Sequence, residues 1–179
     1  FSKIYAAISG ESVHIKVTLG KIRSIMVNVM GEVEVPGTYR LSAFASVFHA
    51  LYRAGGVNRI GSLRTIQVVR NGEKIADVDV YKYIMEGKLA DDIRLSEGDV
   101  ILVSPYENLV GILGKVKRPM IYEMKQGESL ATLINYAGGF TGDAYRNTVR
   151  LVRRSGREKQ IYNVDKVDYE NFILTVDDE

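Results

Sequence analysis

GEVEVPGTY at residues 31–39 returns as GKVKRPMIY at residues 114–122, and this recurrence indicates a duplicated folding unit. Ala-Gly-Gly at residues 54–56 returns at 137–139 with the same offset of 83 residues. Such a period is longer than the roughly 20–50 residues of a solenoid repeat and suits a small tandem domain. The sequence therefore predicts one folding unit built twice, so function is to be sought in a module used in series.

Each copy begins with the pattern of a β-hairpin. Residues 25–29 alternate in polarity, as a half-buried strand does, and residues 38–41 read as the returning strand. Pro36-Gly37 favours a type II turn at the tip, because glycine accepts the positive φ that this turn needs. Met120 replaces that glycine in the second copy, so we expect a different turn there.

An amphipathic helix follows each hairpin, and Ser42 is placed to cap the first one. The apolar positions at helical spacing are Ala43, Val47, Ala50, Leu51 and Ala54 in the first copy and Leu130, Leu133, Ile134 and Ala137 in the second. The Gly-Gly after each stripe indicates the end of the helix, since glycine adopts the left-handed conformation without strain.

Further strands are predicted beyond the helix. They are residues 65–70 and 74–80 in the first copy, 148–153 and 160–164 in the second, and a turn with a buried closing strand within 95–103. The order is hairpin, helix, hairpin and closing strand. A small mixed sheet that wraps one helix would bury the single apolar stripe. The fold class predicted is therefore α+β, with two tandem β-grasp-like units.

These patterns divide the chain into an N-terminal arm or strand (1–21), a first unit (22–105) and a second unit (106–179). After residues 173–176 the second copy shows no counterpart of 95–103, so we expect a C-terminally truncated unit with an open sheet edge. Open edges recruit partners. Our hypothesis is that residues 13–17, from this chain or a neighbouring one, lie near that edge.

Composition excludes several classes. The 179 residues carry a formal net charge of +2, too small to argue for nucleic acid, and contain no cysteine for disulfides or cysteine-ligated metals. No apolar run approaches the roughly 18–20 residues that span a bilayer. Because the chain starts at Phe1, we expect a fragment whose membrane attachment, if any, lies in other parts of the full-length protein.

The ordered motifs resemble a known family. Val-x-Val-x-Gly-x-Val-x-x-Pro-Gly-x-Tyr (27–39), Ala-Gly-Gly (54–56), Val-x-Arg-x-Gly (68–72) and Leu-x-x-Gly-Asp-x-Ile-x-Val (95–103) resemble the soluble-ligand-binding β-grasp (SLBB) domain. Tandem copies are typical of the outer-membrane polysaccharide export family. The resemblance implies a periplasmic, outer-membrane-associated part of a Gram-negative capsule or exopolysaccharide translocon. Its implied partners are polysaccharide, further copies of itself and other export-machinery proteins.

Catalytic chemistry is not indicated. The Ala-Gly-Gly motifs lie at helix C-termini, where the dipole repels phosphate. His14 and His49 are the only imidazoles, and neither has neighbours at zinc-ligand spacing. We therefore expect no enzyme, no cofactor and no metal.

Direct sugar binding is the alternative function, as a soluble glycan-binding or small-ligand module without a conduit role. Arg150 and Arg154 should share a strand face and, with Lys115 and Lys117, could meet an acidic polymer. Ordinary solvated surface charge is the competing interpretation of these four residues. The tyrosines expected to be exposed as sugar platforms are Tyr52, Tyr136, Tyr145 and Tyr162.

Overall fold

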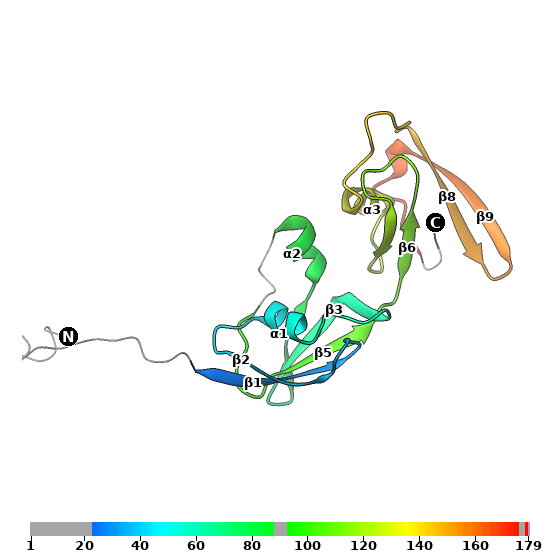
Figure 1. Cartoon of the computed structure of the whole chain (residues 1–179). Helices are drawn as coiled ribbons and strands as arrows, with labels where there is room; N and C mark the ends of the chain where they lie inside the picture. Colours follow the sequence, from blue (N-terminus) through cyan, green and yellow to red (C-terminus); the bar gives the residue numbers. More distant parts are fainter. Residues whose placement is uncertain (1–22, 88–92, 176–177, 179) are drawn as a thin grey trace, which may run out of the picture.

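The structure, a computed structural model, describes residues 23–87, 93–175 and 178. Its first sheet has five strands in the order β2-β1-β5-β3-β4 (Figure 1). The strands are β1 (Ser24–Gly31), β2 (Gly37–Ser42), β3 (Gly61–Arg70), β4 (Glu73–Val78) and β5 (Val100–Pro105). β5 joins the two hairpins, because it pairs parallel to β1 and antiparallel to β3.

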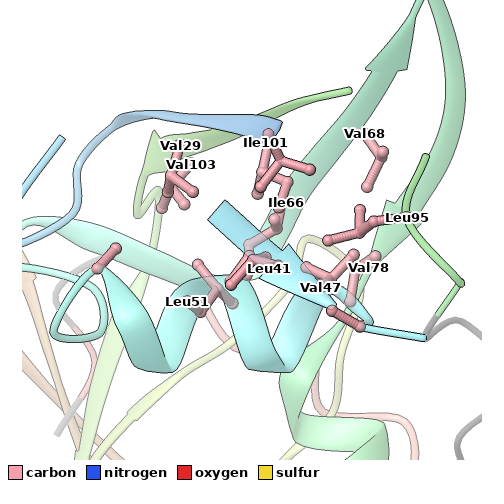
Figure 2. Packing of buried hydrophobic residues seen from close by; sticks show 14 of the residues in the cluster. Val29, Leu41, Val47, Leu51, Ile66, Val68, Val78, Leu95, Ile101 and Val103 are labelled. Atoms are coloured by element: carbon pink, nitrogen blue, oxygen red, sulfur yellow. The ribbon is translucent and has the colours of Figure 1, made fainter. Parts of the chain in front are cut away.

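The helix α1 (Val47–Arg53) covers this mixed sheet and closes the first core. Val47 and Ala50 of the helix are fully buried, as are Ile66 and Ile101 of the sheet. Figure 2 shows the side chains of this core between strands and helix. The predicted α+β, β-grasp-like unit is confirmed.

The second unit repeats the plan with two separate hairpins. β6 (Leu109–Ile112) pairs with β7 (Met120–Glu123), and β8 (Thr148–Ser155) pairs with β9 (Glu158–Asp165). Between them lies α3 (Leu130–Tyr136), whose Leu130, Leu133 and Ile134 are buried, and the short 3₁₀ helix η2 (Lys166–Asp168) follows β9.

The double glycines end both helices as expected. Gly55 and Gly56 have φ of +81° and +89°, and Gly138 and Gly139 have +78° and +81°. The second glycine of each pair presents its carbonyl oxygen to the preceding hairpin tip, where Glu34 N donates over 3.1 Å in the first unit. The motif therefore fixes the tip to the helix end, which explains why both recur together.

The predicted type II turn at Pro36-Gly37 is wrong, and so is the expected difference between the two tips. Gly37 opens β2 as Met120 opens β7. The positive φ lies instead at Gly31 (+82°) and Gly114 (+85°) in both copies. A Cβ atom at Gly31 would come within 2.1 Å of the Val103 carbonyl oxygen, so close approach to β5 also requires glycine there.

Two local predictions at helix starts also fail. The N-cap of α1 is Ser46 rather than Ser42, because His49 Nδ1 accepts the Ser46 N–H at 3.3 Å. β4 ends at Val78, before the predicted residue 80, and a further helix, α2 (Val80–Glu86), begins there. The Asp79 carboxylate accepts the Tyr81 N–H at 3.0 Å and starts this helix.

The expectation that the second unit lacks any counterpart of 95–103 is wrong in part. In the first unit Arg70 Nε donates to the fully buried Asp99 at 2.8 Å. In the second, Arg153 Nε donates to the buried Asp178 at 2.7 Å. The same buried arginine–aspartate pair is thus present in both units. The second copy of the Gly-Asp motif was missed in the sequence because residue 177 is aspartate where the first copy has Gly98.

Between β6 and β8, no strand of the described part of the chain takes the place that β5 has in the first unit. β6 pairs with β7 alone and β8 with β9, apart from the single bridge between Arg153 and Asp178. The hypothesis that residues 13–17 lie near this edge falls outside the described residues.

Extending the chain tests this gap. Because Asp178 corresponds to Asp99, Glu179 stands at the position of Val100, and an extension in register begins with the residue type of Ile101. We expect that adding Ile-Leu-Val-Ser-Pro after Glu179 raises the melting temperature by about 5 °C or more, because a paired central strand adds buried apolar area. The measurement is thermal unfolding followed by circular dichroism. The matched control extension carries aspartate in place of the isoleucine and the valine, whose counterparts Ile101 and Val103 are buried. Equal melting temperatures for both extensions would contradict the prediction.

Candidate functional site: the junction between the two units

Charged and aromatic side chains from both units meet between the two sheets. β3 and α2 supply one side, and the end of β7 with the segment leading into α3 supplies the other. We call this cluster the junction. Its members are Ser62, Arg64, Asp79, Tyr81, Glu123, Lys125, Glu128 and Tyr136.

Arg64 is the centre of the junction and is only 5% exposed. Its guanidinium pairs with Asp79 of its own unit at 3.2 Å and with Glu128 of the second unit at 2.5 Å. Its Cζ lies 5.0 Å from the ring centre of Tyr81 and 5.3 Å from that of Tyr136. One buried cation is therefore shared by carboxylates and aromatic rings of both units.

Glu123 makes a second link across the junction and is also buried. Its carboxylate accepts the Ser62 hydroxyl at 2.5 Å and the Leu63 N–H at 2.9 Å. Its backbone N–H donates to the Tyr81 hydroxyl oxygen at 2.9 Å, and its carbonyl accepts from Arg64 at 3.1 Å. Every described polar group of this residue therefore binds the first unit.

Electrostatics favour the charged forms in the junction. Burial alone would raise the pKa of Asp79, but hydrogen bonds from Lys125 and Arg64 outweigh it and hold that pKa below its usual range. Burial would lower the pKa of Arg64, and its bonds to Glu128 and Asp79 instead raise it. Burial also raises the pKa of Tyr136 to about 12, so its hydroxyl stays protonated.

Apolar packing supports the polar contacts. Tyr81 of α2 belongs to the core of the second unit, with its ring 5.3 Å from Tyr136 in an edge-to-face arrangement. Met85 of α2 packs against the same core, and Leu63 packs against both cores. The helix α2 thus packs in both units, because Val80 belongs to the first core while Tyr81 and Met85 pack in the second.

The sequence indicates this site through differences between the two copies, which hydrophobic periodicity does not detect. At the repeat offset of 83, Lys125, Glu128 and Tyr136 correspond to Ser42, Ala45 and Arg53. The second copy therefore departs from the first at positions that reach across the junction. Comparing the two copies for charges that only the second copy carries would have selected Lys125 and Glu128, but not Tyr136.

The four cations predicted as ligand contacts occupy separate places. Lys115 Nζ pairs with Asp143 at 2.6 Å on the surface. Arg150 lines one hollow and Arg154 another, and neither hollow includes Lys115 or Lys117. The structure thus sets the two arginines at the gap beside β8 and leaves the two lysines at the β6–β7 tip.

The hollow at Arg150 lies where the first unit has β5. It measures about 320 Å³, and its apolar lining includes Val110 and Ile112 of β6 with Leu130 and Leu133 of α3. Arg150 and Lys159 bring positive charge to it. Among the predicted sugar platforms, Tyr145 is exposed, whereas Tyr136 and Tyr162 pack against the second core.

Two kinds of feature are absent from the described ranges. No helix there is long and apolar enough to cross a membrane. No group of three or more His, Cys, Asp or Glu side chains lies within those ranges in an arrangement that could hold a metal ion.

Removing the central cation tests the energetic weight of the junction. We expect Arg64→Ala to lower the free energy of unfolding by about 3–5 kcal/mol, because Glu128 loses its cation and the buried Asp79 keeps only Lys125 as a charged partner. Urea denaturation measures this, with the exposed Arg59→Ala as the matched control, expected within about 0.5 kcal/mol of the unaltered chain. A loss below about 1 kcal/mol for Arg64→Ala would contradict the assignment.

Acid should weaken the junction through Asp79. Since its folded pKa lies below the unfolded value of about 3.9, its contribution is complete above that value and is lost as the pH falls through the folded pKa. We expect the melting temperature to fall as the pH drops below about 4, and Asp79→Asn to flatten this dependence. Asp168→Asn, at an exposed position, serves as control; an unchanged profile in Asp79→Asn would refute the link.

Comparison with known proteins places this geometry in a family. One SLBB domain model matches residues 26–103 and another matches residues 109–163, which together are most of the chain. Two curated relatives from Escherichia coli, each named polysialic acid transport protein KpsD, are 26% identical over 152 residues. The match covers 84% of this chain and 26% of each relative, so the chain spans about a quarter of their length. The chain therefore contains two SLBB domains in tandem and belongs to the SLBB domain family.

Proposed function

We propose that this chain is the periplasmic part of a capsular or exopolysaccharide export protein of a Gram-negative envelope. The observation that carries the proposal is the similarity to polysialic acid transport proteins, which runs through both SLBB units. The residues 22–105 and 106–179 would act as two fixed modules, assembling with further copies or with other export proteins. In this role the chain is not an enzyme.

The junction supports an architectural role. A translocon wall must hold its modules at a set angle, and a buried ion cluster has all its partners only in the arrangement that brings both units together. Arg64, Asp79 and Glu128 provide that constraint. The two units would then transmit force and position as one body.

The alternative function, a soluble glycan or small-ligand module, is favoured by the hollow beside β8. Arg150 lines this hollow and Arg154 the adjacent one, both with apolar neighbours. We propose these arginines, with Lys115 and Lys117, as contacts for an acidic polymer. Binding that weakens in Arg150→Ala and Arg154→Ala and with added salt would support this module.

Export in the bacterium that encodes the chain tests the proposed function. We expect deletion of both units to abolish surface polysaccharide, and Arg64→Ala to reduce it severalfold because the modules lose their fixed arrangement. Surface polysaccharide is measured by immunoblot or uronic-acid assay, with the protein level checked in parallel and Arg59→Ala as control. Normal export after deletion of both units would refute the proposal.

A further inference from the structure

The first unit carries an exposed aromatic hollow on the side of α1 that faces away from the sheet. It measures about 640 Å³, within the roughly 300–1,000 Å³ of many ligand sites. Phe44 is 61% exposed, Tyr52 is 86% exposed, and Tyr83 of α2 adds a third ring. Exposed aromatic groups gathered in one concave place are unusual on a surface that has no binding role.

The repeat shows that folding does not require these rings. At the offset of 83, Phe44 and Tyr52 correspond to Gly127 and Asn135. The buried face of the same helices stays apolar in both copies, as Leu51 and Ile134 illustrate. Phe48 is a different case, because it stacks on Tyr83 with ring centres 4.3 Å apart and so joins α1 to α2. Phe44 has one contact of this kind, with the Arg94 guanidinium, and Tyr52 is left without a structural explanation.

The polar groups around the hollow are donors and cations. Arg53 lines it, and the Arg94 guanidinium lies 5.1 Å from the ring centre of Phe44. His49 Nδ1 accepts the Ser46 N–H, which assigns the ring proton to Nε2 as a donor. Within the described part of the chain, no carboxylate lines the hollow and neither guanidinium forms an ion pair. The hollow therefore suits a negatively charged ligand.

We propose that this hollow binds a segment of an acidic polysaccharide. A pyranose ring presents an apolar C–H face that packs on Tyr52 or Phe44, while its carboxylate pairs with Arg53 and its hydroxyls meet Tyr83. The choice of a glycan rests on the proposed export function. It names a contact site on the first unit, separate from the arginines beside β8.

Titration of the whole chain tests the site. The probes are decamers of galacturonic acid and of sialic acid, with a neutral maltodecaose for comparison, followed by NMR shifts of the α1 and α2 amides. We expect saturable binding of an acidic decamer. Tyr52→Asn should weaken the affinity about tenfold, and Tyr52→Phe should preserve it. Arg53→Gln should also weaken the affinity, and added salt should lower it progressively. Tyr145→Asn, which removes another exposed tyrosine outside the hollow, should bind normally.

Shifts with none of the glycans, equal affinity in Tyr52→Asn, or a change in self-association alone would overturn the proposal. Circular dichroism is the control for folding of Tyr52→Asn. We expect this variant to fold, because asparagine already occupies the equivalent position of α3. An export assay separates the two claims. If deletion of both units blocks export while Tyr52→Asn exports normally and binds as the unaltered chain does, the glycan site fails and the export function stands.

Discussion

A single buried guanidinium holds this molecule together. Burying the Arg64 guanidinium costs its hydration free energy. Ion pairs with Asp79 of the first unit and Glu128 of the second offset that cost. Neither unit alone offers a complete environment for it. The arrangement of the two units is therefore a condition for burying the charge, and the apolar contacts of Tyr81 and Leu63 follow from that arrangement.

The shared contacts of Arg64 distinguish this tandem repeat from two independent domains on a linker. Two β-grasp units joined by a linker would move independently, as domains with small polar interfaces commonly do. In this chain α2 packs in both cores, with Val80 in the first and Tyr81 in the second. The pair is therefore one structural module, as the proposed wall-forming role would require, and the outer face of α1 and the gap beside β8 lie outside the junction.

The repeated elements could be predicted from sequence because local patterns set them. Alternation around Val27 and Val29 predicted the first hairpin, and the glycine pairs predicted where α1 and α3 end. The misses arose where one side chain overrides a pattern: Asp79 starts α2 inside an apparent strand, and Asp178 repeats Asp99 without the preceding glycine. The junction escaped prediction because Arg64 and Glu128 lie 64 residues apart, with no local signal joining them.

The junction should hold the two units as one rigid body. Residual dipolar couplings of backbone amides, measured separately for the first and second units in one weakly aligned sample, are the measurement to make. We expect a single alignment tensor that fits both sets with the arrangement described here. Two tensors of different magnitude or orientation would show that the units move independently, and the junction would lose the role assigned to it.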